Sequence, residues 1–170
     1  MEPFDDPLDV LCAGHEGTER QLRTLERLLS HVAQHGVDEP ARRGAEAVMR
    51  YFDTAGNVHH RDEDEDLFPC VRAVAARDGR VEIGATLYEL GREHHALALM
   101  YAALRERLAG IAEGRDERLD AGLVERFCWL HRRHMAVEAG VIVPFARRSL
   151  GPGQLSDTGS RMAARRGAPT

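Results

Sequence analysis

Two segments of the sequence repeat one pattern of residues that can bind metal ions. Residues 59–69 and 134–144 both read His-x-x-x-Glu-x-x-x-apolar-apolar-Pro. On a helix, residues four apart lie on the same face with Cβ atoms about 5–6 Å apart, so each histidine and its carboxylate can converge on one point. Two such helices that face each other can enclose two metal ions. The two pairs are His59 with Glu63 and His134 with Glu138.

The apolar neighbours of both pairs predict that these side chains face the protein interior. His59 lies seven residues after Phe52, and His134 lies seven residues after Phe127. Burying the two glutamates as unpaired anions would cost several kcal/mol each. No arginine or lysine lies on either apolar stripe to pair with them. A metal cluster would remove the cost, so the pattern predicts metal ligands.

Two further predicted helices each offer one inward histidine. His15 lies seven residues before Leu22, and His94 lies seven residues after Leu87 and seven before Tyr101. A single buried histidine is usually a hydrogen-bonded core residue. Four of them, one on each predicted helix and two with a carboxylate four residues later, favour a metal site instead. Tyr101 is expected to pack in the core with its hydroxyl bonded.

Neighbouring histidines leave the choice of ligand open at some positions. Glu63 selects His59 over His60, and the apolar stripe favours His94 over His95. His60, His95 and His131 could contact the ligands or lie exposed. The acidic run 62–66 is expected to be mostly a solvated face, in which only Glu63 has the phase that points inward.

Helix signals are dense and strand signals are nearly absent. Helices are expected from about Pro7 to Gly36, from 38 to 69 with a kink or break near Pro69, from 81 to 110 and from 116 to 148, with a short apolar turn at 71–76. Long helices with short connections predict an all-α, antiparallel up-down-up-down four-helix bundle over residues 1–149. Residues 150–170 are rich in Gly, Pro and Ser and are expected to form a disordered tail.

The composition narrows the class of protein. The net charge of −5 leaves no basic stripe for a nucleic acid, and no apolar run approaches the roughly 20 residues that span a bilayer. The first ten residues lack the pattern of a signal peptide, which predicts a cytoplasmic protein. The three cysteines are expected to be reduced thiols. A monomer or a weak homodimer is expected.

With these motifs in place, the sequence resembles the hemerythrin family in its HHE cation-binding branch, over about residues 8–148. The resemblance implies a non-haem di-iron site, oxo- or hydroxo-bridged, with His15, His59, His94 and His134 as nitrogen ligands and Glu63 and Glu138 as bridging carboxylates. The segments that carry it are Gly14-His15-Glu16, His59-His60-x-x-Glu63-x-x-x-Leu67-Phe68-Pro69, Arg92-Glu93-His94 and His131-x-x-His134-Met135-x-x-Glu138.

Two departures from the family pattern bear on function. Oxygen-carrying members have a fifth histidine one turn after the ligand of the third helix, where this chain has Ala98. They also end the pattern with an aspartate at a longer spacing, where this chain has Glu138. The chain therefore resembles the four-His, two-Glu members, which are implicated in the response to nitric oxide or peroxide and in iron handling.

Counting donors indicates what such a site can do. Four imidazoles and two bridging carboxylates fill about eight of about twelve octahedral positions on two irons, and a bridging oxygen fills about two more. The remaining positions admit a small ligand such as dioxygen, nitric oxide or peroxide. The sequence leaves two hypotheses open: a protein that binds or senses the ligand, and an enzyme that disproportionates hydrogen peroxide or acts on nitric oxide. Iron handling or storage is a third, weaker reading, because nothing predicts a cage.

Overall fold

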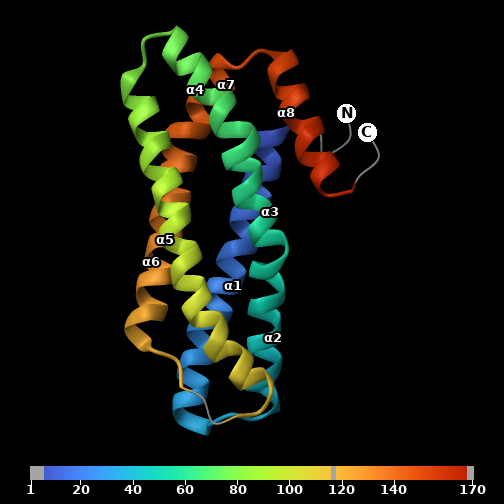
Figure 1. The fold of residues 1–170 in the computed structure, drawn as a ribbon, viewed down its shortest axis with the longest axis vertical. Helices are drawn as coiled ribbons and strands as arrows, with labels where there is room; N and C mark the ends of the chain where they lie inside the picture. The colour runs from blue at the N-terminus through green and yellow to red at the C-terminus, as the bar shows by residue number, and fades with distance from the viewer. Residues whose placement is uncertain (1–5, 116–117, 168–170) are drawn as a thin grey trace.

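The computed structural model describes residues 6–115 and 118–167, which form helices and no strand (Figure 1). This confirms the predicted all-α class. Residues 1–5, 116–117 and 168–170 lie outside the described residues, and with them the expected start of the fourth helix near 116. The elements are α1 (Pro7–His35), α2 (Glu39–Asp53), α3 (Ala55–Asp62), η1 (Glu63–Leu67), α4 (Phe68–Arg77), α5 (Val81–Ala112), α6 (Ala121–Val137), η2 (Glu138–Ile142), α7 (Val143–Ser149) and α8 (Pro152–Arg165).

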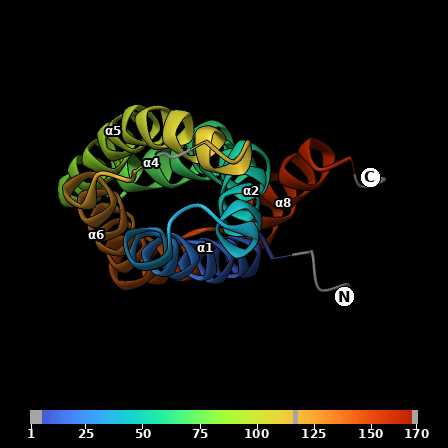
Figure 2. The ribbon, with the colours of Figure 1, turned by 90° about the horizontal axis from the view of Figure 1, so that it is seen from below.

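Four lines of helix enclose the core. Seen end-on, α1, α2, α5 and α6 surround it, and each packs against the next in that order, with α6 closing back on α1 (Figure 2). The helices α3 and α4 continue the line of α2, and α7 continues the line of α6 (Figure 1). Among the described residues, no helix combines the length and the apolar character that crossing a bilayer requires.

The starts of the first two helices follow the predicted signals. The side chain of Asp6 accepts a hydrogen bond from the Leu8 backbone N–H at 2.8 Å, and Asp38 does the same for Ala41 at 3.0 Å. Such caps satisfy N–H groups that have no partner within the helix. Gly36 ends α1 with a φ of 76°, a conformation that glycine adopts without a steric penalty.

The helix containing Pro69 is not broken, but it widens into a π-turn just before the proline. In η1 the Phe68 N–H donates to the Glu63 carbonyl, five residues back, and in η2 the Val143 N–H donates to Glu138 in the same way. Each proline then falls in the first turn of the next helix, where its missing N–H is tolerated. The repeated Glu-x-x-x-apolar-apolar-Pro spacing therefore encodes two π-turns, each beginning at a glutamate.

The apolar core consists of two clusters separated by a polar layer. The upper cluster of Figure 1 includes Leu11, Leu67 and Leu90, and the lower cluster includes Leu22 and Leu97. Each helix line passes from one cluster to the other. On α1 His15 lies between the two clusters, and on α5 His94 does so. This arrangement confines the predicted ligands to one level of the bundle.

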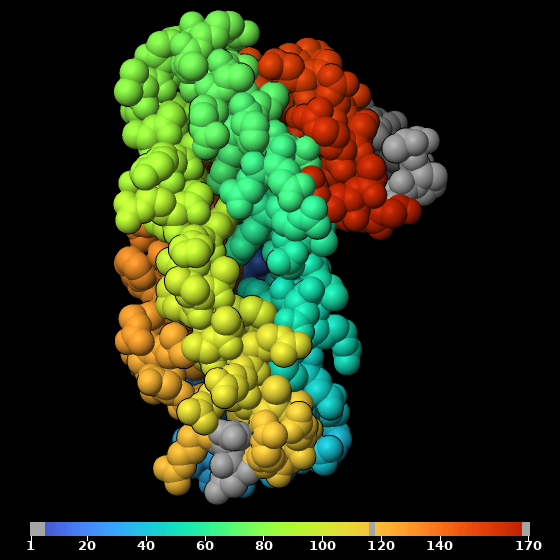
Figure 3. Space-filling view, in the orientation of Figure 1, coloured from blue at the N-terminus to red at the C-terminus, as the bar shows by residue number. Residues whose placement is uncertain are grey.

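The prediction of a disordered tail was wrong for most of that segment. Residues Pro152–Arg165 form α8, which buries Thr158, Gly159 and Met162 and packs against α1 and η1 (Figures 1 and 3). The expectation of a mostly solvated acidic run was wrong for Asp62 and Asp66, which are buried, whereas Asp64 and Glu65 are exposed as expected. The two errors have one cause: arginines of α8 pair with these carboxylates, and neither segment shows this partner in its own composition.

Candidate metal centre

The structure brings all six predicted ligands together in the polar layer. They form two overlapping groups whose donor atoms lie within 4.8 Å of one another. Both groups contain Glu63 and Glu138, which begin the two π-turns. The first group is completed by His15 and His59, and the second by His94 and His134.

Each glutamate extends one oxygen toward each group. For Glu63, Oε1 lies 3.0 Å from Nε2 of His59, and Oε2 lies 3.0 Å from Nε2 of His94. For Glu138, Oε2 lies 2.9 Å from Nε2 of His15, and Oε1 lies 3.4 Å from Nε2 of His134. Both carboxylates therefore span the two groups, as a bridging ligand must.

The unsatisfied oxygens of this layer test whether the residues fit metal ions. Both glutamate side chains are fully buried, yet neither oxygen of Glu63 nor Oε1 of Glu138 has a hydrogen bond of acceptable geometry. The imidazole nitrogens are near enough but are not aligned on these oxygens. Buried carboxylate oxygens without partners are rare and costly. A cation between the donors would satisfy them, so the residues fit the metal site.

Two acidic side chains fix the orientation of the second pair of histidines. Nδ1 of His94 donates to Asp64 at 2.9 Å, and Nδ1 of His134 donates to Glu93 at 3.1 Å. Arg133 also pairs with Glu93. With Nδ1 protonated, Nε2 is left to face the shared space, which is how proteins orient histidine ligands. The sequence interpretation missed both acids, although Glu93 adjoins His94 and Asp64 adjoins Glu63.

The charges of the layer perturb its titration. Burial lowers the pKa of His94, but Asp64 and Glu63 outweigh it and raise that pKa to about 10. Burial raises the pKa of Glu63, but the imidazoles of His59 and His94 lower it well below its usual range. In the metal-free protein these opposite shifts favour a proton on His94 and the negative charge on Glu63.

We therefore expect metal uptake to release protons and to strengthen as the pH rises. Metals bind the neutral imidazole, whereas His94 stays protonated below its raised pKa of about 10. A metal ion must displace this proton, which becomes easier at higher pH. Titration calorimetry with Co²⁺ in buffers of different ionisation enthalpy should show proton release and a higher affinity at pH 8 than at pH 6. An affinity independent of pH would contradict the prediction.

Three other histidines lie close to the ligands in the sequence but join neither group. The His60 ring stacks on His94, with centroids 4.3 Å apart and an angle of 20° between the planes. Burial lowers the pKa of His131 to about 3, and its ring packs edge-on against Phe127. His95 is exposed. The structure thus places His59 and His94 in the groups, as the sequence interpretation preferred.

Replacing His59 and His60 by alanine, one at a time, distinguishes the residue that binds metal from the residue that only packs beside it. We expect His59→Ala to lose metal at its group, since two histidines complete that group. We expect His60→Ala to retain metal and to lose about 1–3 kcal/mol of stability from the cavity left behind. Metal content by mass spectrometry of the native protein and thermal melts measure the two effects. Loss of metal in His60→Ala would show that the ligand was misassigned.

A glycine on α1 makes room for one of the ligands, and the sequence interpretation gave it no role of its own. A Cβ atom built on Gly14 would lie 2.3 Å from Nδ1 of His59. The Tyr51 hydroxyl donates to the Gly14 carbonyl at 3.1 Å and holds this part of α1 against α2. Tyr101, by contrast, donates to Asp53 at 2.8 Å, in keeping with a packing role.

A groove between α1 and α6 borders one of the six site residues, His15. It has a volume of about 560 Å³, and its wall includes His15, Arg132, Met135 and Ala139. The side chain of His15 is 13% exposed, whereas Glu138 beside it is fully buried. The first group can therefore be approached from this groove.

The chain belongs to the hemerythrin family: a family model described as the hemerythrin HHE cation binding domain matches residues 6–146. The match spans the elements that carry all six site residues. The chain is also similar to an uncharacterized protein of Haemophilus influenzae, with 29% identity over 163 residues, covering 96% of this chain and 91% of that protein. The family and the geometry together support a metal-binding site.

Proposed function

We propose that this chain is a non-haem di-iron protein that binds or reacts with a small ligand: dioxygen, nitric oxide or peroxide. His15 and His59 would hold one iron, His94 and His134 the other, and Glu63 and Glu138 would bridge the two. The observation that carries the proposal is the pair of fully buried carboxylates, each extending its oxygens toward both groups of imidazoles. The scaffold proposed is the antiparallel up-down-up-down bundle of residues 1–149.

The donor set favours iron over zinc. Zinc prefers four-coordinate sites rich in thiolate or imidazole, whereas mixed imidazole and carboxylate donors with open positions suit iron. A di-iron centre supplies redox chemistry and open coordination positions to a small ligand. The residues themselves do three things. The carboxylates neutralise cationic charge, the outward acids orient two imidazoles, and the apolar clusters keep bulk water from the layer.

The groove beside His15 supports a ligand of small size. His15 is the partly exposed residue of its group, while His59, Glu63 and Glu138 are buried. A small molecule can reach this edge of the site from the groove between α1 and α6. A bulkier substrate would need the helices to separate. We infer a role in the response to oxidative or nitrosative stress, because the candidate ligands are the agents of that stress.

Peroxide disproportionation is the second candidate function, and Ala98 favours it. Oxygen carriers of the family are expected to hold a fifth histidine at this position, but Ala98 is exposed and donates nothing to the second group. One donor fewer would leave a coordination position open beside His94 and His134. An open position on the second iron favours reactivity over simple carriage.

Stopped-flow spectroscopy of the reduced, iron-loaded protein separates the two functions. Mixing with dioxygen should give a stable spectrum that reverses under vacuum if the protein carries or senses the gas. Mixing with hydrogen peroxide should give rapid oxygen evolution if it is an enzyme. The Glu63→Ala variant treated with iron in parallel is the control for iron bound elsewhere. Failure of the wild-type protein to take up iron would overturn the proposal.

A further inference from the structure

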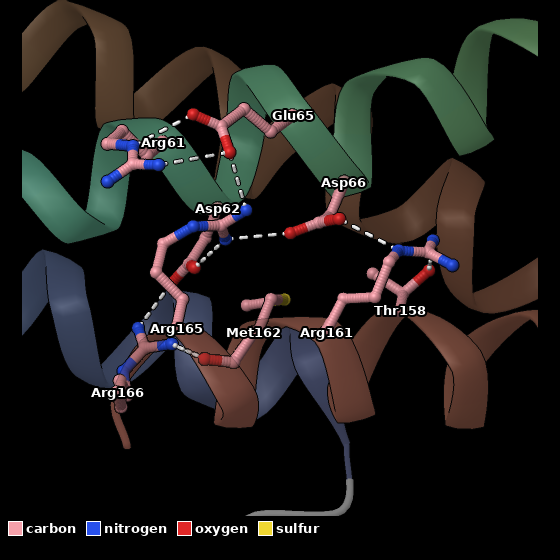
Figure 4. Close-up of polar contacts among 9 residues, drawn as sticks. All are labelled: Arg61, Asp62, Glu65, Asp66, Thr158, Arg161, Met162, Arg165 and Arg166. Atoms are coloured by element: carbon pink, nitrogen blue, oxygen red, sulfur yellow. Dashed lines mark hydrogen bonds and ion pairs between the residues drawn. The ribbon is translucent and has the colours of Figure 1, made fainter. Parts of the chain in front are cut away.

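The C-terminal helix forms ion pairs with the acidic segment 62–66, which comprises the last residue of α3 and most of η1. Arg165 donates from Nη1 to Asp66 at 2.7 Å and also to Asp62, and from Nη2 to Glu65 at 2.8 Å (Figure 4). Arg161 donates to Asp66 at 2.8 Å, and Arg166 pairs with Asp62. One helix thus binds carboxylates both before and after Glu63 in the sequence.

These ion pairs offset the repulsion among the acidic residues of segment 62–66. Residues 62–66 are five consecutive carboxylates, and like charges this close on a helix repel one another. Asp62 and Asp66 are only 1% and 4% exposed, so they need a positive partner. The side chain of Arg165 is itself only 13% exposed, which strengthens its ion pairs. Arg61 pairs with Glu65 at 2.8 Å and His94 with Asp64. Among the described contacts, however, the ion pairs of the buried Asp62 and Asp66 come from the C-terminal arginines.

The second π-turn provides an internal comparison. Residues 138–142 read Glu-Ala-Gly-Val-Ile, so Glu138 has no acidic neighbour in its turn. Ile142 and Val143 pack in the upper cluster and hold η2 by apolar contacts. Leu67 and Phe68, at the same spacing after Glu63, pack in the same cluster. Apolar packing therefore follows both bridging glutamates, and Glu63 differs in that its acidic neighbours also pair with a separate helix.

We propose that Arg165, supported by Arg161 and Arg166, is a positioning residue for the metal centre, which fixes Glu63 in its bridging orientation by holding Asp62 and Asp66 on either side of it. This inference rests on the proposed metal function. Arg165 touches no ligand; it acts through the backbone of η1. The C-terminal helix thereby helps to orient a ligand of the centre.

Substitution of Arg165 in the full-length protein tests the inference. In metal-free Arg165→Gln we expect hydrogen exchange to accelerate about tenfold in residues 62–69 and to stay unchanged in 137–144. We expect Co²⁺ affinity to fall about tenfold with altered visible absorption of the bound ion. Arg165→Lys should restore part of both. Arg161→Gln, at a side chain 54% exposed, should show the same changes more weakly and guards against failure of the first variant to fold.

The matched control is Arg147→Gln. Arg147 also pairs with two carboxylates, Asp6 and Asp9, but it lies on α7 away from η1. It should leave both readouts unchanged. Wild-type exchange rates and Co²⁺ binding in Arg165→Gln and Arg161→Gln would overturn the inference, as would faster exchange with unchanged Co²⁺ affinity and absorption. If the wild-type protein binds no metal, the proposed function fails, while exchange in 62–69 still shows whether Arg165 holds the turn.

Discussion

Replacing Glu63 or Glu138 with alanine should lower the iron content from about two ions per chain to well under one, without unfolding the protein. Each glutamate reaches both groups, so either substitution removes a donor from both ions. The metal-free fold should survive, because the change deletes a fully buried carboxylate with unsatisfied oxygen. Iron analysis, circular dichroism and thermal melts measure the two effects separately.

A matched control is Glu89→Ala, which removes an exposed glutamate paired with Arg92 on α5. Its iron content should equal that of the wild type. Metal ions should raise the melting temperature of the wild type and of this control. At a hundredfold excess over Kd, the free energy of unfolding should increase by about 2.7 kcal/mol. The two site variants should lose this increment. Full iron retention in both would contradict the assignment of the centre.

The Gly14→Ala variant should lose metal affinity by tenfold or more through a single added methyl group. That methyl would sit 2.3 Å from Nδ1 of His59, so the ring must move or α1 must shift. Overpacking of this kind costs about 1–3 kcal/mol, which on average exceeds the gain of about 0.5–1 kcal/mol that alanine brings to a helix interior. Co²⁺ titration and urea unfolding of the variant should both show the loss.

Gly91→Ala on α5 is the control for this substitution, because a Cβ there meets no atom within 4 Å. It should bind metal normally and gain about 0.5–1 kcal/mol of stability, as expected for alanine in a helix. Equal behaviour of the two variants would show that Gly14 makes no room for His59. A gain of stability in Gly14→Ala would point the same way.

Much of the centre was predictable because helical periodicity carries it. His59, Glu63, His134 and Glu138 follow a spacing that one face of a helix explains, and His15 and His94 share the phase of their apolar stripes. The structure brings these six residues together. Their role as ligands stays a prediction until metal is measured.

The features that escaped prediction depend on contacts between distant segments. Arg165 meets Asp62 across about a hundred residues of sequence, so neither the order of α8 nor the burial of the acidic run is visible locally. The space for His59 depends on Gly14. From the sequence alone, this glycine indicates only a residue that lowers the stability of a helix. The π-turns at Pro69 and Pro144 were expected only as a kink or break at the first of them, because proline excludes a regular helix without specifying what replaces it.

The two π-turns also determine how this sequence can tolerate change in length. An α-helix rotates by about 100° per residue, and a π-turn holds one residue more than an α-turn. Five residues in a π-turn rotate about as far as four in an α-helix, so each π-turn absorbs its extra residue and leaves the helix before and after it on the same faces. Phe52 and Leu67, which lie in different apolar clusters, can therefore both face the interior although an extra residue separates them. Deleting one residue from 64–66 would restore a regular helix without changing these faces, whereas deleting one residue from 55–61 would rotate the two parts by about 100° relative to one another.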